Sequence, residues 1–230
     1  LDKKYLAQRA SLIGEKSMGT AKFGTPPGMS NLAWGLDTSP EFPCTSHISI
    51  VDAKGNALSM TTTIEDQFGS RQMVDGFLLN NQLTDFSFDS VDANGPIANR
   101  VQAGKRPRSS MSPTLVFDKA TKKIILSTGS PGGSAIINYV AKVLVGTLDW
   151  GLNVQQAINL PNFGSRNGPT ELEQGRVSEA LVDQLKVKGH NVRVMEQTSG
   201  LQGIMRTNIH GEEMWFGGAD PRREGIVMGD

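Results

Sequence analysis

The sequence has little cysteine, little histidine and no excess of charge of either sign. Its single cysteine, Cys44, excludes an internal disulfide framework and a cysteine-based zinc site. The three histidines are scattered along 230 residues, which argues against a metal centre. Because 23 basic side chains balance 23 acidic ones, the composition gives no support for a nucleic-acid partner or for binding to an anionic membrane.

Long hydrophobic runs are also lacking, since no stretch approaches the roughly 20 apolar residues needed to span a bilayer. No signal peptide heads the sequence, but Leu1 is not a natural start, so we expect a piece of a longer chain. At 230 residues the piece is long enough to bury a full core as one domain, or as one domain with an attached segment.

Local patterns place a change of organisation at Cys44. Residues 1–13 are expected to form a short helix, and residues 19–44, which are rich in turn-forming residues, a linker. Alternating residues predict two β-hairpins, over 47–63 and 114–127. The remaining patterns predict helices over 134–150, 154–159 and 178–188, followed by strands over 191–195, 204–208 and 213–216. Strands, then helices, then strands favour an α+β domain over alternating βαβ units.

Thr45 opens the first predicted strand, directly after Pro43-Cys44. A threonine in this place is most often a simple strand former. As a nucleophile its hydroxyl needs a base, and an N-terminal threonine has one in its own α-amino group, whose ordinary pKa is about 8. Cleavage of the Cys44–Thr45 bond would therefore make Thr45 a nucleophile that requires no histidine.

A glycine-rich turn, Gly129-Ser130-Pro131-Gly132-Gly133, precedes the most apolar predicted helix. It is either a tight strand-to-helix turn or a set of backbone N–H groups that converge on an oxyanion at a helix start. No lysine follows the glycines, so the turn is not a phosphate-binding loop of the GxxxxGK[ST] kind.

Two polar segments have open interpretations. The first segment, 105–113, is basic and is either a solvated loop or an anion-binding patch. The neutral composition disfavours nucleic acid as the anion. The adjacent hydroxyl groups of Ser109 and Ser110 can instead donate to a carboxylate. The second, 80–85, is either an Asx-type turn or a set of amide and carboxylate acceptors for an ammonium group.

These motifs occur in one order with the Gly55-Asn56 turn, residues 149–153 and Ala219-Asp220-Pro221-Arg222-Arg223. The series resembles the small subunit of gamma-glutamyltransferases (gamma-glutamyltranspeptidases). The resemblance covers residues 45–230, which would be the small, catalytic subunit. Residues 1–44 resemble the C-terminal end of the large subunit and the linker to the processing site.

The resemblance implies an N-terminal nucleophile (Ntn) hydrolase fold, an α+β αββα sandwich shared between two subunits cut from one precursor. It implies the large subunit as a partner, an assembly of two large and two small subunits, and no metal or organic cofactor. It favours a periplasmic or secreted location. The implied reaction transfers or hydrolyses γ-glutamyl groups of substrates such as glutathione, with an amino acid, a peptide or water as acceptor.

The resemblance also assigns roles to residues. Thr45 would cleave the precursor at Cys44–Thr45 and then attack the γ-glutamyl amide, and Thr63 would be the second threonine beside it. The other implied roles are oxyanion binding by Gly132 and Gly133, carboxylate binding by Ser109 and Ser110 together with an arginine of the large subunit, and ammonium binding by Gln82 and Asp85.

Two positions depart from the family pattern. Glu65 stands where many of these enzymes have an asparagine near the substrate amine, and Thr84 stands where they have an aspartate. The carboxylate of Glu65 can still pair with an ammonium group. Because both changes concern recognition of the glutamyl head group, two alternatives stay open: an acylase of the glutaryl (cephalosporin) type with the same fold, and a non-catalytic binding relative.

Overall fold

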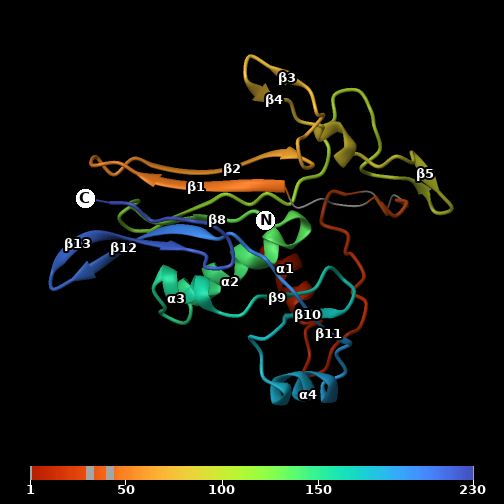
Figure 1. Ribbon diagram of the computed structural model, residues 1–230. Helices are drawn as coiled ribbons and strands as arrows, with labels where there is room; N and C mark the ends of the chain where they lie inside the picture. The colour runs from red at the N-terminus through yellow and green to blue at the C-terminus, as the bar shows by residue number, and fades with distance from the viewer. Residues whose placement is uncertain (1, 30–33, 40–43, 230) are drawn as a thin grey trace.

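The computed structural model describes residues 2–29, 34–39 and 44–229, and an antiparallel four-stranded sheet lies at its centre. In sheet order the strands are β13 (Glu212–Ala219), β12 (Gln202–Ile209), β8 (Ile124–Gly129) and β7 (Thr114–Phe117). A hairpin of β1 (Cys44–Val51) and β2 (Ala57–Glu65) lies over one face of this sheet, and α2 (Ile136–Leu148) and α3 (Val154–Asn159) cover the other (Figure 1). The three layers confirm the expected α+β class.

The hydrophobic core lies between the four-stranded sheet and the two helices. Tyr139 and Val143 of α2 lie one turn apart on the face that meets the sheet, and α3 begins with a capping box between Asn153 and Gln156. Burial of each large apolar side chain contributes about 1.5–3 kcal/mol. The core residues are Leu126, Tyr139, Val143, Val154, Ala157, Ile158 and Leu201.

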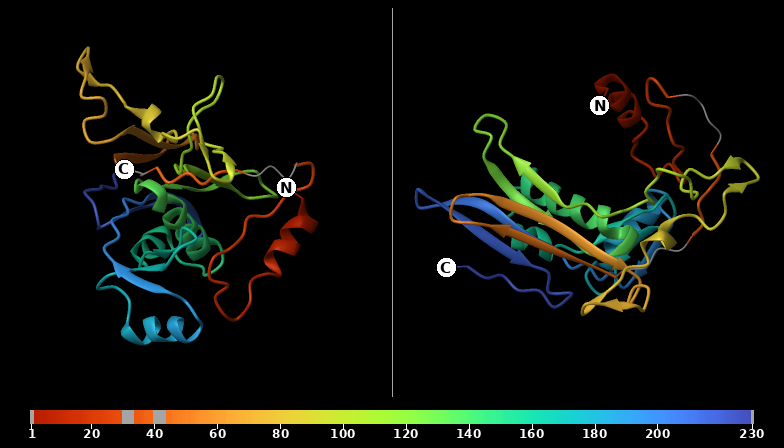
Figure 2. Two further views of the ribbon diagram at one scale, coloured as in Figure 1. Left: turned by 90° about the vertical axis from the view of Figure 1, so that its right-hand side faces the viewer. Right: turned by 90° about the horizontal axis from the view of Figure 1, so that it is seen from above.

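Smaller elements surround these layers (Figure 2). A three-stranded sheet pairs β10 in parallel with β11 and antiparallel with β9, and α4 lies beside it. Two short hairpins, β3–β4 and β5–β6, belong to a lobe beyond the end of β2. The bounds are α1 (Lys3–Ala10), β3 (Met73–Val74), β4 (Phe77–Leu78), 3₁₀-helix η1 (Gln82–Asp85), β5 (Val91–Asp92), β6 (Gly95–Pro96), 3₁₀-helix η2 (Gly133–Ala135), β9 (Phe163–Gly164), β10 (Thr170–Glu173), α4 (Glu179–Val187) and β11 (Val192–Met195).

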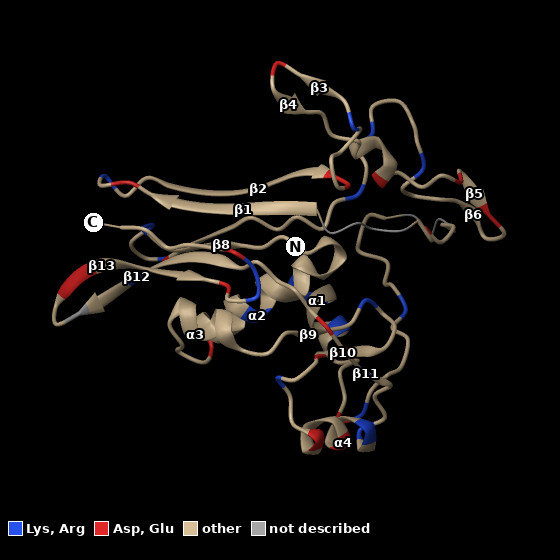
Figure 3. Cartoon of the chain, viewed as in Figure 1, with Lys and Arg blue, Asp and Glu red and all other residues tan. Residues whose placement is uncertain are grey.

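The β1–β2 hairpin has its polar face toward the sheet and its apolar face outward. On the inner face, Ser59 Oγ donates to the Thr128 carbonyl at 3.0 Å, and Ser127 Oγ donates to the Leu58 carbonyl at 3.1 Å. Charged residues occur only at the ends of the hairpin (Figure 3). The outer face carries four large apolar side chains that are 39–50% exposed: Ile48, Ile50, Leu58 and Met60. An apolar row of this kind on one side of a hairpin requires a covering layer.

Both predicted hairpins and all three predicted helices after residue 130 are confirmed; the helix over 154–159 has the predicted ends, and the other elements have ends shifted by three residues at most. The N-terminal helix is shorter than expected and ends at Ala10. Strand β10 was not predicted, because its alternation spans four residues only and its partner β11 comes after α4. Part of the expected linker falls on residues 30–33 and 40–43, outside the described residues. Within the described part of the chain, no helix has the length and apolarity to cross a membrane.

Candidate active site

Most of the predicted site residues meet at one small cavity of about 40 Å³ at the start of β1. It is lined by β1, β2, η1, the loop before β7 and the turn before α2, which lie up to 91 positions apart in the sequence. Its lining residues are Thr45, Thr63, Glu65, Gln82, Asp85, Arg108, Ser109, Ser110, Met111, Gly133 and Ile136. Every residue that the resemblance placed in the site lines this cavity, except Cys44 and Gly132.

Thr45 and Thr63 are direct cross-strand partners in the hairpin. The peptide bond before Thr45 is engaged as well, since Thr63 Oγ1 donates a 2.7 Å hydrogen bond to the Cys44 carbonyl oxygen. The same hydroxyl accepts the N–H of Glu65 at 2.9 Å. A donor aimed at this carbonyl withdraws electron density from its carbon, which favours attack by a nucleophile.

A β-bulge at the end of β2 turns Glu65 into the site. Cys44 pairs with Glu65 while Thr45 pairs with Thr63, so Ile64 is the extra residue. Glu65 has a φ of 76°, in the left-handed region that is unusual for a residue other than glycine. Such backbone conformations persist where surrounding contacts hold them, and they concentrate at functional sites.

The Glu65 side chain is 4% exposed and is held by two neighbours. Thr84 Oγ1 donates to Glu65 Oε2 at 3.0 Å, and Asn81 Nδ2 donates to the same oxygen. Burial raises the pKa of Glu65, and nearby Asp85 and Asp66 raise it further, against the opposing effect of the two hydrogen bonds. A site with this local charge favours a cationic ligand.

Gln82 and Asp85 are the first and last residues of η1. Gln82 Nε2 donates to Asp85 Oδ2, so the two side chains are held together beside the cavity. The preceding asparagines make the turn that the sequence allowed, since Asn80 Oδ1 accepts the N–H of Gln82 at 2.9 Å. The two interpretations of this segment are therefore compatible: a local turn presents an amide and a carboxylate to the cavity.

The glycine-rich turn has the backbone that its sequence predicts. Gly132 and Gly133 have φ values of 139° and 56°, and the helical chain starts with η2 at Gly133. A Cβ on Gly132 would lie 2.6 Å from Cε2 of Tyr139, which only glycine avoids. Gly133 lines the small cavity, whereas Gly132 lies behind it against Tyr139.

The basic segment before β7 is only partly a solvated loop. Arg106 is exposed, and Lys105 Nζ donates to the Ala98 carbonyl at 2.6 Å. Arg108 instead lines the cavity and forms a 2.8 Å ion pair with Asp37. The sequence did not single out Arg108 as a residue of the cavity, although its position directly before Ser109 was an available signal. It also did not identify Asn81 as a hydrogen-bond donor to Glu65.

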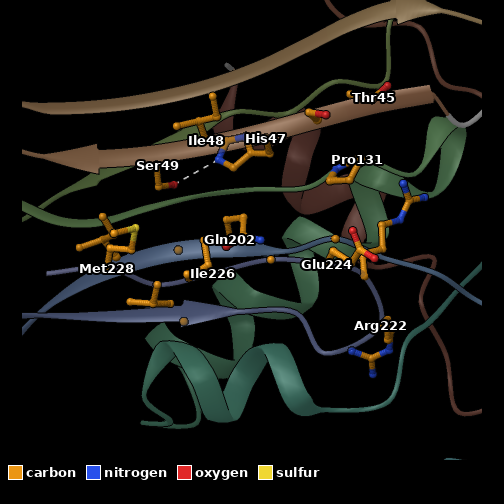
Figure 4. A pocket seen from close by; sticks show the side chains of 18 of the residues that line it. Thr45, His47, Ile48, Ser49, Pro131, Gln202, Arg222, Glu224, Ile226 and Met228 are labelled. Carbon is orange, nitrogen blue, oxygen red and sulfur yellow. Dashed lines mark hydrogen bonds between the residues drawn. The ribbon is translucent and has the colours of Figure 1, made fainter. Parts of the chain in front are cut away.

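Thr45 also lines a larger cavity of about 860 Å³ (Figure 4). It lies between β1, β12 and the C-terminal segment 222–228. His47 lines it and is buried, with Nδ1 2.8 Å from Thr61 Oγ1 and Nε2 3.2 Å from Ser49 Oγ. Burial lowers the pKa of His47 to about 4, so its imidazole is neutral at pH 7. His47 therefore supports the strand as a neutral hydrogen-bonding group.

Among residues 2–29, 34–39 and 44–229, no three His, Cys, Asp or Glu side chains lie close enough together to hold a metal ion. The residues that the structure does bring together include two threonines, two serines, a glycine, an arginine and two acidic residues. Groups of these kinds are the ones that acyl transfer by a hydroxyl nucleophile requires.

Comparisons with known proteins agree with this class. The gamma-glutamyltranspeptidase family profile matches residues 1–230. The glutathione hydrolase proenzyme of Escherichia coli K12 is 41% identical over 187 residues, which are 77% of this chain and 31% of that protein. The glutathione hydrolase proenzyme of Pseudomonas sp. strain A14 is 32% identical over 248 residues, or 100% of this chain and 41% of that protein.

Solved structures agree as well. A mutant of Helicobacter pylori gamma-glutamyltranspeptidase superposes with a TM-score of 0.68 and 34% identity, over 77% of this chain and 99% of that one. Cephalosporin acylase from Bacillus halodurans superposes with a TM-score of 0.77 over 99% of this chain and 38% of that one, but at 24% identity it shows the fold alone. The chain belongs to the gamma-glutamyltranspeptidase family and has the α+β Ntn-hydrolase fold. It spans 31–41% of the length of the two curated relatives.

Proposed function

We propose that the full protein is a gamma-glutamyltransferase and glutathione hydrolase that first cleaves its own chain between Cys44 and Thr45. The observation that carries the proposal is the hydrogen bond from Thr63 to the Cys44 carbonyl, beside a cavity that Thr45, Thr63 and Gly133 line. Both relatives are glutathione hydrolase proenzymes, and this supports both parts of the proposal.

Self-cleavage starts when Thr45 Oγ attacks the Cys44 carbonyl carbon. The Thr63 hydroxyl stabilises the negative charge that develops on the carbonyl oxygen. The C–N bond breaks, the proton that Oγ loses passes to the Thr45 nitrogen, and the acyl group of Cys44 is left as an ester on Thr45 Oγ. Water hydrolyses the ester, which leaves a Cys44 carboxylate and a free α-amino group on Thr45.

Acyl transfer then uses the same hydroxyl with its new base. The Thr45 amine accepts the Oγ proton as Oγ attacks the γ-glutamyl carbonyl, and the N–H groups at Gly132 and Gly133 are the proposed oxyanion donors. Loss of one such donor typically costs about 3–4 kcal/mol of transition-state stabilisation. The amine product leaves with the proton, and water or an acceptor amine releases the glutamyl group from Thr45.

The charges around the cavity suit a glutamyl head group. Ser109 and Ser110 can donate to its α-carboxylate, and Glu65 with Asp85 can accept its α-ammonium. Because Glu65 and Asp85 would be left uncompensated by an acyl group without an ammonium, the site favours γ-glutamyl over glutaryl substrates.

The remainder of the full protein is the proposed partner of the outer face of the β1–β2 hairpin. Ile48, Ile50, Leu58 and Met60 form an uncharged row there, and the chain lacks about three fifths or more of the length of its curated relatives. With the boundary at Cys44–Thr45, residues 1–44 end the upstream subunit and residues 45–230 form the downstream one. The resemblance supports the further proposal of an assembly with two copies of each subunit.

The test is expression of the full-length precursor as wild type, Thr45→Ala and Ser46→Ala, followed by intact-mass measurement. We expect cleavage between Cys44 and Thr45 in the wild type and in Ser46→Ala, whose altered side chain is on the outer face of β1. Thr45→Ala should stay intact. Cleavage of a folded Thr45→Ala variant at the same bond would refute the proposal.

Hydrolysis of γ-glutamyl-p-nitroanilide and glutaryl-p-nitroanilide by the cleaved wild type then tests substrate class. We expect kcat/KM to be at least tenfold higher for the γ-glutamyl compound. A preference for the glutaryl compound would assign an acylase. A folded protein that binds L-glutamate, does not self-cleave and shows no turnover would be a binding relative.

A further inference from the structure

Ser130 stands inside the glycine-rich turn, and its side chain is fully buried. Its Oγ donates a 2.7 Å hydrogen bond to the carbonyl oxygen of the next residue, Pro131, and accepts the N–H of Gly200 at 3.2 Å. Because the incoming N–H occupies a lone pair of the hydroxyl group, the hydroxyl proton is directed at the Pro131 carbonyl. The hydroxyl is therefore fixed within the turn by a donor and an acceptor.

The Pro131 carbonyl belongs to the same peptide group as the Gly132 N–H. A peptide group is planar, so a hydrogen bond that fixes its C=O also fixes the direction of its N–H. A donor on the carbonyl also draws electron density from the peptide nitrogen, which makes the N–H a stronger donor. The Ser130 hydroxyl therefore orients and polarises one of the two N–H groups that are the proposed oxyanion donors.

The segment 199–201, between β11 and β12, packs directly against the turn. A Cβ on Gly200 would lie 2.6 Å from Cγ of Pro131 and 3.0 Å from Cδ of Arg223, so only glycine permits this approach. Gly200 reaches Ser130 across 70 positions of sequence. The position of the turn therefore depends on where this segment is held.

Asp220 holds segment 199–201 from the other side. Its side chain is 1% exposed, and its Oδ2 accepts the Ser199 hydroxyl and, at 3.1 Å, the Leu201 N–H. The Asp220 N–H donates in turn to the Leu201 carbonyl at 2.9 Å. The other carboxylate oxygen, Oδ1, accepts the N–H and Nη1 of Arg222, both at 3.0 Å. Four donors thus fix one buried carboxylate, and charge-assisted bonds of this kind are the strong ones.

Ser199 connects the same group to the helix that follows the turn. Its Oγ accepts Nδ2 of Asn162 at 2.8 Å, and Asn162 Oδ1 accepts Nζ of Lys142 at 2.8 Å. Lys142 belongs to α2. The hydrogen bonds from Asp220 therefore reach the turn at its start, through Ser130, and beyond its end, through α2.

We propose that Ser130 and Asp220 are positioning residues for acyl transfer. Asp220 fixes segment 199–201, the Gly200 N–H fixes the Ser130 hydroxyl, and this hydroxyl holds the peptide group that presents the Gly132 N–H. The role rests on the proposed function, in which the turn binds the oxyanion. Oxyanion donors act because they are held in place before the reaction, so a loosened support lowers the rate of the chemical step more than the affinity for substrate.

The first experiment compares Ser130→Ala with Ser127→Ala in the full-length protein. Ser127 is the matched control, because it is equally buried and its Oγ contacts Ser49 Oγ and the Leu58 carbonyl at 3.1 Å, outside the turn. In cleaved Ser130→Ala we expect kcat for γ-glutamyl-p-nitroanilide to fall about fivefold or more, a part of the effect of losing a whole oxyanion donor, with KM changed less than about threefold. Ser127→Ala should keep the wild-type kcat. A wild-type kcat in Ser130→Ala would overturn the proposal.

Two further measurements separate the positioning of the oxyanion donor from a general loss of packing. Self-cleavage uses the Thr63 hydroxyl as its donor, so Ser130→Ala should cleave at the wild-type rate, followed by intact mass. The cleaved variant should bind a boronic acid analogue of the γ-glutamyl group, which forms a tetrahedral adduct with Thr45, about fivefold or more weakly. L-Glutamate, whose γ-carboxylate is planar, should bind as it does to the wild type. Slower self-cleavage, or equal losses for the two ligands, would show a packing role and overturn the proposal.

The part of Asp220 is tested with Asp220→Asn and with Ser199→Ala, a milder change that folds more readily. Each should lower kcat for γ-glutamyl-p-nitroanilide with little change in KM. Added to Ser130→Ala, the Ser199→Ala change should have a smaller effect than it has alone, because both act on one chain of hydrogen bonds. Independent effects, or a wild-type kcat in Ser199→Ala, would overturn the proposal. Absence of any hydrolysis by the cleaved wild type would instead refute the proposed function, so the two failures are distinguishable.

Discussion

Thr63 Oγ1 donates its hydrogen bond to the Cys44 carbonyl at 2.7 Å while it accepts the N–H of Glu65 at 2.9 Å. The incoming N–H occupies a lone pair of the hydroxyl and directs its proton at the carbonyl. Hydrogen bonds in such a chain polarise one another, so each is stronger than it would be alone. The β-bulge at Glu65 brings these three groups into line.

We expect Thr63→Val, which keeps the shape of the side chain but removes the donor, to slow cleavage at Cys44–Thr45 by about 10²–10³-fold, the usual effect of losing one oxyanion donor. The rate is followed by intact mass over time. Thr62→Val is the matched control, because Thr62 is exposed on the outer face of β2 and should cleave at the wild-type rate. Cleavage of Thr63→Val as fast as the control would contradict the role of the hydroxyl.

A second prediction concerns the contact between the two sheets. A Cβ on Gly129 would lie 2.3 Å from Cε1 of the buried His47 ring, which hydrogen bonds hold in place. Gly129→Ala should therefore destabilise the protein by about 1–3 kcal/mol through overpacking. Thermal melting measures the effect, and Gly168→Ala, where a Cβ meets nothing within 4 Å, is the control. Equal melting temperatures for the two variants would rule out this contact.

The support of Glu65 gives a third prediction. Thr84→Val removes the 3.0 Å hydrogen bond to Glu65 Oε2 and leaves Asn81 as the remaining donor. A hydrogen bond to a charged group contributes about 1.5–3 kcal/mol. Without its support Glu65 would be less well placed, and part of this energy would be lost from substrate binding, so KM for γ-glutamyl-p-nitroanilide should rise about three- to tenfold. The glutaryl analogue has no ammonium group and serves as the control. A similar rise for both substrates would argue against a role in ammonium recognition.

The raised pKa of Glu65 gives a fourth prediction, about pH. A substrate with an ammonium group needs the ionised carboxylate of Glu65. Burial raises the pKa of Glu65 above its ordinary value of 4.5, so the side chain becomes protonated at a higher pH than a free carboxyl group does. As pH falls, kcat/KM for the γ-glutamyl substrate should therefore begin to decline above that value. In Glu65→Gln this limb of the profile should be lost and the plateau lowered. A wild-type decline that persists unchanged in Glu65→Gln would assign the titration to another group.

A fifth prediction concerns Lys142, which is 3% exposed and donates to three oxygens: the Ile158 and Leu160 carbonyls and Asn162 Oδ1. Lys142→Met leaves these acceptors buried without their donor. Each buried acceptor without a partner lowers the free energy of unfolding by about 1–3 kcal/mol before the structure relaxes. We expect a lower melting temperature by several degrees at pH 7. Lys186→Met, at an exposed lysine, should melt as the wild type does. No difference between the two variants would mean that water replaces the ammonium group.

The elements that the sequence predicted well are those whose signals are local. The hairpin around Gly55 and the helix α3 depend on alternation, turn residues and a capping box within about ten positions. The strand β10 was missed because its parallel partner lies beyond α4. In the candidate site, the ordered motifs contain most of the residues that line the cavity but did not single out Arg108, and the resemblance supplied the roles that remain proposals.

By itself, then, the sequence determined the class of the fold, the family and the residue types of the site, because these can be recognised from local periodicity and from the order of short motifs. Only the tertiary structure decided which groups meet. Asp37 reaches Arg108 across 71 positions, and Thr63 reaches the Cys44 carbonyl across 19. The bulge that turns Glu65 inward depends on the register of two paired strands, and register is a property of the assembled hairpin.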